Sequence, residues 1–377
     1  MTARPTEQMR IVRLEVIPIA LPFRERYRTA SGELTEREMV VIRLHTDFGF
    51  HGLGEAVPLS LRGGPRLGQV ASELAACGPL LAGADASAAQ TRIPSAIRAW
   101  AWELLNRCRR EHVGAQVISA LDIALHDLAG RISGLPMWRL LGANGVRELG
   151  CNATLDAGDP GRVAERAARL WAVGYTTFKI KVGSGEDQAR VAAVRHAVGD
   201  GPRIRIDANG AWTAAEATER LRELQPYGIE LAEQPCAGIQ EMAEVRSRIP
   251  IPIVADESVA SLDDAKQVLL NRACDAATIK LAKVGGPLEA LRIAAILPSF
   301  LSSALDGPVG IAAALHTAQA MPYGGYADRF AHGLATLGLF SKVYADPAGL
   351  LAPVVTPPPA AGLGIDVDDS ALQEFRI

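Results

Sequence analysis

Residues 176–182 read TTFKIKV, and five further apolar runs follow: RIRIDA at 203–208, IELAEQ at 229–234, IPIVADE at 251–257, DAATIKL at 275–281 and FLSSAL at 300–305. Each run precedes a stretch with helical spacing of apolar residues; these stretches cover 187–198, 214–224, 239–248, 262–270, 288–296 and 309–321. Apolar strands that alternate with helices predict a parallel sheet covered on both faces. So many units within about 200 residues favour closure into a barrel.

Charged residues recur at or near the carboxyl ends of these runs. Consecutive members of the series lie 26, 26, 23 and 24 residues apart, which is one strand and one helix each time. They therefore reach about the same height in a barrel, at the mouth where barrel enzymes build active sites. One charge at a strand end is usually solvated, but five in register are costly to bury unless they form a common site. The series is Lys181, Asp207, Glu233, Asp256 and Lys280.

Three carboxylates in this series predict a bound cation. Asp207, Glu233 and Asp256 offer only oxygen ligands, which hard ions such as Mg²⁺ or Mn²⁺ prefer. Three protein ligands leave about half of an octahedral shell for water and substrate. No histidine occurs among them, so the pattern disfavours a zinc hydrolase site. We predict that these residues bind Mg²⁺, with Mn²⁺ as a possible substitute.

The lysines indicate which chemistry the cation would assist. Lys179 and Lys181 lie two residues apart, so both point to the same face of their strand. Two ammonium groups that close repel each other, which predicts a lowered pKa and a neutral amine that can act as a base. Lys280 lies across the barrel, so a substrate carboxylate on the metal would have a lysine on either side. This predicts removal of the proton next to a carboxylate, because Mg²⁺ and an ammonium stabilise the enediolate.

The composition bounds the remaining possibilities. The 377 residues suit a barrel with a smaller second domain, and 49% hydrophobic and 21% charged residues are typical of a globular chain. A net charge of −3 argues against nucleic acid or an anionic membrane as a partner. No signal peptide or membrane-spanning run is visible, and the five cysteines form no CxxC pair. We therefore expect a cytoplasmic protein with reduced thiols.

The first part of the chain has a different pattern. Residues 10–20 and 38–46 are rich in Val, Ile and Leu and predict two antiparallel strands joined by a long loop, RERYRTASGELTE. Residues 116–129 place apolar side chains on one stripe of a predicted helix. A Pro- and Gly-rich tail ends in GLGIDVD, which predicts a short strand that returns to the first domain. The expected divisions are an α+β domain at 1–145, a barrel at 146–345 and a returning segment at 346–377.

The motifs, taken in order, resemble the enolase superfamily. KIKVG, RIDANGAW, ELAEQP, IVADES and ATIKLAKVGG are similar to its barrel motifs, and residues 120–143 are similar to part of its capping domain. The resemblance covers nearly the whole chain. It implies an α/β protein with a modified TIM barrel, (β/α)7β, and an N-terminal α+β capping domain. A lysine at position 280 resembles the muconate lactonizing enzyme subgroup, because the mandelate racemase subgroup would have an aspartate there.

The resemblance also implies roles for single positions. The three carboxylates would be magnesium ligands, and Lys181 would be the general base. Lys280 would be the opposing acid/base or a cation that stabilises the intermediate, and Lys179 would tune Lys181. Asn209 would lie in the next layer around the metal. The substrate would be a small-molecule carboxylate, and the protein would be a homo-oligomer.

Several reactions remain open within the subgroup. The stretches NATLDAGDP, LSSALDGPVGIAAAL and HGLATLGLF look most like o-succinylbenzoate synthases of the actinobacterial type, which implies syn-dehydration. Ser302, Ser303 and Asp306 would then contact the substrate. The stretch LDGPVGIAAALHTA also resembles muconate cycloisomerases, and the same lysines would serve epimerisation of a dipeptide or N-acyl amino acid. A non-catalytic metal-binding barrel is a further alternative, although every predicted catalytic position holds a competent residue.

Two polar segments of the first domain predict specificity loops over the barrel mouth, at about residues 24–33 and 59–67. The resemblance implies that such loops close the site. The first contains Arg24, Arg26 and Arg28, and the second, SLRGGPRLG, contributes two further arginines. These arginines would bind a second substrate carboxylate or would be solvated loop charges, and both interpretations remain open.

Overall fold

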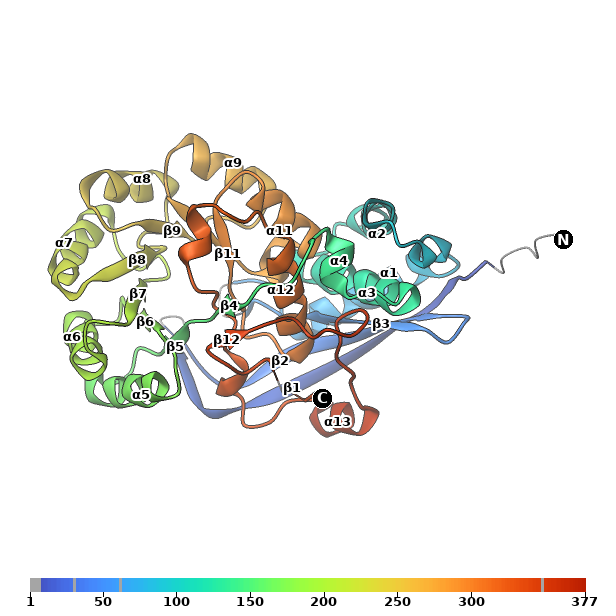
Figure 1. Ribbon diagram of the computed structural model, residues 1–377, viewed down its shortest axis with the longest axis horizontal. Coiled ribbons are helices and arrows are strands. Elements are labelled where there is room, and N and C mark those ends of the chain that lie inside the picture. Colours follow the sequence, from blue (N-terminus) through green and yellow to red (C-terminus); the bar gives the residue numbers. More distant parts are fainter. Residues whose placement is uncertain (1–7, 30–31, 61–62, 347–348) are drawn as a thin grey trace.

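The structure is a computed structural model, and it describes residues 8–29, 32–60, 63–346 and 349–377. Two parts lie against each other: an α+β cap formed by the N-terminal part of the chain, and a barrel of parallel strands (Figure 1). Figure 1 shows the barrel helices α5 to α9 on the left and the cap helices α1 to α4 on the right. None of the described helices is both long and apolar enough to cross a bilayer.

The cap is built on a three-stranded antiparallel sheet in the order β1–β2–β3. The strands are β1 (Ile11–Thr29), β2 (Gly32–Thr46) and β3 (His51–Ala56). The long loop predicted between the first two strands is wrong, because most of RERYRTASGELTE continues both strands as a ribbon. Backbone pairing lets the ribbon continue through mostly polar residues, and Tyr27 and Leu34 pack against the hydrophobic core. Residues 30–31 of the first predicted loop and residues 61–62 of the second lie outside the described residues.

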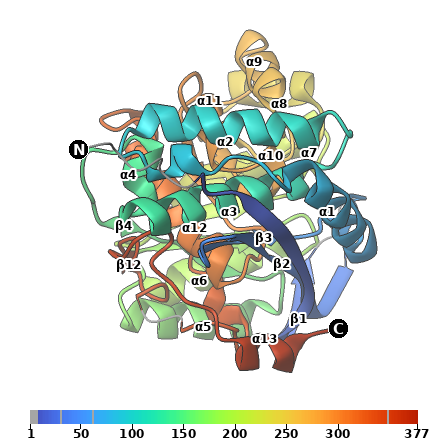
Figure 2. The ribbon, with the colours of Figure 1, turned by 90° about the vertical axis from the view of Figure 1, so that its right-hand side faces the viewer.

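Helix α3 (Ala115–Ser133) joins the cap sheet to the barrel. A Cβ atom on Gly52 or Gly54 of β3 would lie 2.1 Å from a carbonyl oxygen of this helix, so only glycine allows so close an approach. The single apolar stripe predicted for α3 is too narrow, because the helix is buried on nearly all sides by β3, α2, α10 and α11. Figure 2 shows α2 beside α3, on the side away from the sheet. The other cap helices are α1 (Leu67–Leu81), α2 (Pro94–Arg109) and α4 (Met137–Leu141).

The barrel contains seven parallel strands in chain order, β5 to β11. The strands are β5 (Ala153–Leu155), β6 (Thr177–Lys181), β7 (Arg203–Asp207), β8 (Ile229–Glu233), β9 (Ile253–Ala255), β10 (Ala276–Ile279) and β11 (Ser299–Leu301). The helices are α5 (Pro160–Ala172), α6 (Asp187–Val198), α7 (Ala214–Leu224), α8 (Ile239–Arg248), α9 (Leu262–Leu270), α10 (Leu281–Val284), α11 (Pro287–Ala294) and α12 (Pro308–Ala320). The predicted α/β class, with a barrel and a cap, is confirmed. One strand–helix unit, formed by β5 and α5, precedes the six strand–helix units that the sequence indicated.

A two-residue segment, 332–333, closes the sheet between its outer strands. His332 exchanges two backbone hydrogen bonds with the residues just before β5, at 2.7 and 2.8 Å. Gly333 exchanges two with the end of β11, at 2.8 and 2.9 Å. These four bonds turn the curled sheet into a ring, and the segment takes the place of an eighth strand.

The C-terminal segment returns to the cap, but the expected strand is not formed. GLGIDVD makes a single bridge, from Gly362 to Pro136. Gly362 and Gly364 both have left-handed φ angles, of 67° and 68°, which interrupt an extended strand. Near the end of the chain, Arg376 forms a bridge to Ile19 of β1. The remaining strands are β4 (Leu149–Gly150) and β12 (Val354–Val355), which pair with each other, and the remaining α-helix is α13 (Asp369–Phe375).

Candidate active site

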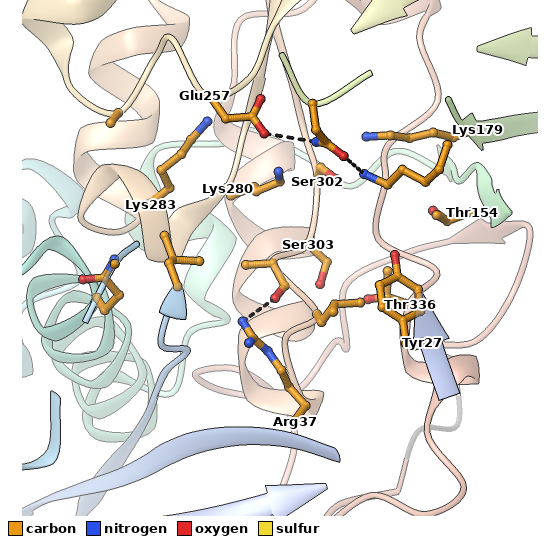
Figure 3. A pocket seen from close by; sticks show the side chains of 18 residues that line it. Tyr27, Arg37, Thr154, Lys179, Glu257, Lys280, Lys283, Ser302, Ser303 and Thr336 are labelled. Carbon is orange, nitrogen blue, oxygen red and sulfur yellow. Dashed lines mark hydrogen bonds between the residues drawn. The ribbon is translucent and has the colours of Figure 1, made fainter. Parts of the chain in front are cut away.

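A cavity of about 350 Å³ lies at the carboxyl ends of the barrel strands (Figure 3). Its barrel lining comes from β5 and β6 and from the residues that follow β7, β9, β10 and β11. Its cap lining comes from β1, β2, α3 and the loop after β3. The cavity therefore lies at the junction of the two parts, and each part supplies side chains to it.

The three carboxylates predicted to bind metal, here called the carboxylate trio, come together beside this cavity. Asp207 and Glu233 pair across the neighbouring strands β7 and β8, and Asp256 directly follows β9. One oxygen of each side chain lies within 4.8 Å of the others, and all three side chains are buried. Neighbouring parallel strands end at the same edge, so residues at their ends project to one place.

Lys179 compensates the charge of two members of the trio. Its Nζ atom donates to both oxygens of Glu233 at 2.7 Å and lies 2.9 Å from Asp207. Burial alone would lower the pKa of Lys179, but Asp207, Glu233 and Asp256 outweigh burial and raise the pKa above its ordinary value. Lys179 is therefore a fixed cation. The pKa lowering that the sequence predicted for a lysine pair does not occur at this lysine, because carboxylates surround it.

Lys181 lies at the end of the same strand and points to the same face. Its Nζ atom donates to Asp207 at 2.6 Å and to Oδ1 of Asn209 at 2.8 Å. Asn209 has a left-handed φ of 48°, and its backbone amide donates to Asp207 at 3.0 Å. The Asn209 side chain also donates to Glu257 at 3.0 Å. Asn209 thus holds the Lys181 amine beside the carboxylates.

Two lysines contact Asp256. Lys280 follows β10, and its Nζ atom donates to one carboxylate oxygen of Asp256. The Nζ atom of Lys283 lies 2.7 Å from the other oxygen. Burial lowers the pKa of Lys283, and Asp256 opposes part of that effect. The sequence prediction missed Lys283, although its place one helical turn after Lys280 is a signal that could have identified it.

The carboxylate trio suits a hard divalent cation. All its donors are carboxylate oxygens, buried and close enough to share one ion. Burial would raise the pKa of Asp207, but Lys179 and Lys181 hold it well below its usual range. Burial raises the pKa of Glu233, and Lys179 offsets only part of this. A divalent cation would favour the ionised form of every member, so the residues fit the predicted metal.

The structure brings two of the three predicted substrate contacts after β11 to the cavity. Ser302 and Ser303 line it. Asp306 is not part of the lining, because its carboxylate accepts the amide of Ala304 at 2.8 Å and its own amide donates to Ser303 Oγ at 2.8 Å. Burial raises the pKa of Asp306 in this turn. In place of the expected substrate contact, Asp306 shapes the turn that leads into α12.

The cap supplies different residues from those expected. Arg37 of β2 lines the cavity, together with Tyr27 of β1. Arg24 and Arg26, for which the sequence left substrate binding and solvation both open, are exposed and line a separate groove against α5. The side chain of Arg28 lies outside the described part of the chain. A search for arginines in loops could not find Arg37, because it lies in the middle of a paired strand.

Comparison with known families agrees with this arrangement. Residues 162–371 match the family described as enolase C-terminal domain-like. Residues 11–142 match the mandelate racemase/muconate lactonizing enzyme N-terminal domain. The two matches correspond to most of the barrel and to the cap.

Three known proteins show how the resemblance is distributed. An o-succinylbenzoate synthase of Thermobifida fusca is 42% identical over 235 residues, which is 60% of this chain and 70% of that protein. A dipeptide epimerase from Enterococcus faecalis, solved with Mg and the dipeptide L-Leu-L-Tyr, has a TM-score of 0.85 and 28% identity over 95% of this chain and 99% of that chain. A muconate lactonizing enzyme from Pseudomonas fluorescens, solved with muconolactone, has a TM-score of 0.89 and 28% identity over 98% of this chain and 100% of that chain. The chain is therefore an enzyme of the enolase superfamily and belongs to the mandelate racemase/muconate lactonizing enzyme family.

Proposed function

We propose that the protein removes the proton α to a carboxylate of a small-molecule substrate, and that the outcome is syn-dehydration of the o-succinylbenzoate synthase type. The observation that carries the proposal is the presence of lysines from two different strands at one carboxylate trio. Lys181 contacts Asp207, and Lys280 contacts Asp256. A substrate whose carboxylate is held at the trio would therefore have an amine on either side of its α-carbon.

Three lysines have different roles in the proposed proton transfer. Lys181, as a neutral amine, takes the α-proton, and the electrons of the C–H bond pass into the carboxylate to give an enediolate. Lys179 remains a cation, because the carboxylates raise its pKa, and this leaves Lys181 as the base of the pair. Lys280 presents an ammonium to the developing negative charge. Mg²⁺ held by the carboxylate trio, with Mn²⁺ as a substitute, would add positive charge at the same carboxylate.

Dehydration follows when the enediolate expels a hydroxyl group from the neighbouring carbon. The electrons of the enediolate form the new C=C bond, and the C–O bond breaks. The ammonium of Lys181 returns its proton to the leaving oxygen, so water departs and the amine is restored. In a syn-elimination the proton and the hydroxyl leave from one face, which lets a single lysine serve both steps. Ser302 and Ser303 would hold the substrate through their hydroxyl groups.

Two observations favour dehydration over dipeptide epimerisation. In sequence comparison, identity with the Thermobifida fusca synthase is 42% over 60% of the chain, against 31% over 95% of the chain with the hydrophobic dipeptide epimerase of Enterococcus faecalis. A dipeptide also carries an ammonium group, which a carboxylate would bind. Among the described residues that line the cavity, Glu257 is the acidic one, whereas five are basic: Arg37, Lys179, Lys181, Lys280 and Lys283.

Epimerisation or cycloisomerisation is the second candidate, because two lysines suit proton transfer at either face of the α-carbon. Substitution of Lys280 separates the outcomes. In an epimerase, Lys280→Ala would abolish deuterium exchange from one enantiomer and spare the other. In a dehydratase that uses Lys280 as a cation, the same change would lower the rate with no dependence on the enantiomer.

The first experiment is turnover of the hydroxylated cyclohexadiene dicarboxylate that loses water to give o-succinylbenzoate. The purified chain is assayed with Mg²⁺ and after EDTA treatment, with Lys181→Ala as the control for contaminating enzymes. Efficient turnover that needs both metal and Lys181 would support the proposal. Absence of turnover would favour epimerisation or cycloisomerisation instead. The next experiment would then be α-proton exchange in D₂O across a carboxylate library.

The remaining expectations concern the protein as a whole. The non-catalytic alternative is set aside, because the chain belongs to a family of enzymes and retains the lysines and carboxylates. A homo-oligomer and a cytoplasmic location stay proposals. Light scattering of the purified chain tests the first, and fractionation of cells tests the second.

A further inference from the structure

The carboxylate trio is surrounded by cations that belong to the chain itself. Each carboxylate oxygen of the trio accepts a hydrogen bond from a described residue, and most of these donors are lysine amines. The four lysines that contact the trio are Lys179, Lys181, Lys280 and Lys283. A divalent cation at the trio would therefore enter a place that already contains positive charge, and it would have to share carboxylate oxygens with ammonium groups.

Lys283 differs from the other three lysines, because the proposed proton transfer gives it no role. Its Nζ atom lies 2.7 Å from Oδ1 of Asp256 and also donates to the backbone carbonyl of that residue. Lys280 donates to Oδ2, so each carboxylate oxygen of Asp256 has an ammonium group beside it (Figure 3). The Asp256 side chain is 0% exposed and that of Lys283 is 10% exposed, so solvent screens their interaction only weakly.

The fold fixes Lys283 in this place. It lies in the single turn of α10, and its amide donates to the carbonyl of Lys280 at 2.9 Å. Gly285 and Gly286 end the turn with left-handed φ angles of 94° and 101°. A Cβ atom on Gly286 would lie 2.7 Å from Oδ2 of Asp122 in α3, so the turn approaches the cap closely. The backbone of Lys283 is therefore restricted from both sides.

We propose that Lys283 opposes metal binding at the trio, because its ammonium group holds Asp256 before a divalent cation binds and repels the cation afterwards. Removal of this charge should raise the affinity for the metal, whereas removal of a residue that only shapes the site should lower it. The proposal rests on the proposed function in one respect, namely that the trio is the metal site. In return, Lys283 keeps a buried carboxylate paired when no metal is bound, since an unpaired buried charge is costly.

The test measures metal binding without substrate, so it does not depend on turnover. Mn²⁺ is titrated into the full chain, and the free ion is followed by EPR. Lys283→Met should bind Mn²⁺ at least roughly 10-fold more tightly than the wild type, because a unit charge beside a divalent cation is removed. Lys283→Gln keeps a donor for the Asp256 carbonyl but no charge, and it should bind as tightly as Lys283→Met. Lys283→Arg keeps the charge and should retain the wild-type affinity.

Thermal unfolding with and without Mn²⁺ gives a second readout. Without the ion, Lys283→Met should unfold at a lower temperature than the wild type, because Asp256 loses a partner. With the ion, the same variant should gain more stability than the wild type, because tighter binding to the folded state stabilises it more. The matched control is Lys266→Met, which changes an exposed lysine on α9 and should leave both measurements unchanged.

Three results would overturn the proposal: wild-type or lower affinity in Lys283→Met, an affinity of Lys283→Arg as high as that of Lys283→Met, or no binding of Mn²⁺ to any of the proteins. If Lys283→Met fails to fold, Lys283→Gln and Lys283→Arg decide the outcome in the same way. Turnover with an unchanged affinity in the variants would remove only the role of Lys283, and a raised affinity without turnover would remove only the dehydration.

Discussion

Lys179 and Lys181 contact different partners, although they lie two positions apart on one strand. Lys179 contacts two carboxylates, whereas Lys181 contacts one carboxylate and the neutral side chain of Asn209. An amide oxygen binds the amine without adding negative charge. The carboxylates around Lys179 raise its pKa, which keeps it protonated, and the proposed function assigns the proton transfer to Lys181. In that proposal, Asn209 would help to separate the two roles.

Replacement of the proposed base tests this division. Lys181→Ala should slow α-proton exchange in D₂O by roughly 10²- to 10⁴-fold, because a positioned general base contributes about that much. The exchange is followed by NMR with the substrate that the turnover experiment identifies. Lys266→Ala, which alters an exposed lysine paired with Asp263 on α9, is the matched control and should retain full activity. Full exchange in Lys181→Ala would show that another residue is the base.

Replacement of one carboxylate tests the metal site without any substrate. Asp207→Asn should weaken binding of Mn²⁺, measured by EPR of the free ion, by at least about 100-fold, because it removes an anionic ligand. Asp263→Asn changes an exposed carboxylate and should leave affinity unchanged. Thermal unfolding is measured in parallel, since Lys179 and Lys181 lose a partner. Unchanged affinity in folded Asp207→Asn would place the metal elsewhere.

The sequence predicted the site residues that recur with the period of one strand and one helix. The trio, Lys181 and Lys280 follow that period, so their meeting at one edge could be read from spacing alone. Arg37 and Thr336 belong to no such series, because distant parts of the chain bring them to the cavity. Spacing could not reveal them. Asp306 fits the period, yet it is turned into the fold by hydrogen bonds within its own turn.

At the scale of elements, the contact of β3 with α3 depends on glycine. A Cβ atom on Gly54 would lie 2.1 Å from the carbonyl oxygen of Ala120. Relief of this clash would require the backbone of β3 or α3 to shift, which costs packing free energy. Gly54→Ala should therefore lower the free energy of unfolding by more than about 3 kcal/mol, measured by urea denaturation. Gly68→Ala in α1 meets nothing within 4 Å and should be neutral or stabilising by up to about 1 kcal/mol. Equal stability of the two variants would contradict this close contact.

The elements themselves were predictable to different degrees. The barrel strands are buried on both faces, so their continuous apolar runs marked them in the sequence. The outer part of the β1–β2 ribbon was missed, because Arg24, Glu25 and Arg26 face solvent and resemble loop residues. Only the pairing register, which includes Tyr27 with Leu34, shows that the strands continue. Propensity thus fails where a paired strand carries mostly exposed polar residues.

At the scale of the whole molecule, one buried carboxyl group joins the cap to the barrel. Glu55 of β3 accepts the amide of Gly307, just before α12, at 2.8 Å, and it accepts the hydroxyl of Tyr344. Burial, together with the nearby carboxyl group of Asp306, raises the pKa of Glu55 to about 7. The protonated form of Glu55 therefore suits the folded arrangement best.

This junction makes stability depend on pH. The pKa of Glu55 is higher in the folded state than in the unfolded state, so the folded state binds more protons between about pH 4.5 and about pH 7. The contribution of Glu55 is fully present below that window and is lost as the pH rises through about 7, at up to about 1.4 kcal/mol per pH unit. Glu55→Gln should flatten this part of the stability curve, measured by urea denaturation at several pH values.

The control for this prediction is Glu219→Gln, an exposed position on α7, which should leave the pH dependence unchanged. If the free energies of unfolding of the wild type and Glu55→Gln run parallel from about pH 4.5 to about pH 7, Glu55 is ionised in both the folded and the unfolded state over that range.

The segment at 332–333 connects the last barrel strand to the first through few residues. It exchanges four backbone hydrogen bonds with its neighbours, and the amide of Leu301 also donates to Nδ1 of His332 at 3.1 Å. The chain runs on from there to Thr336 in the cavity wall, so the segment that closes the barrel also positions part of the binding surface. A substitution that loosens this closure is therefore expected to change ligand binding as well as stability.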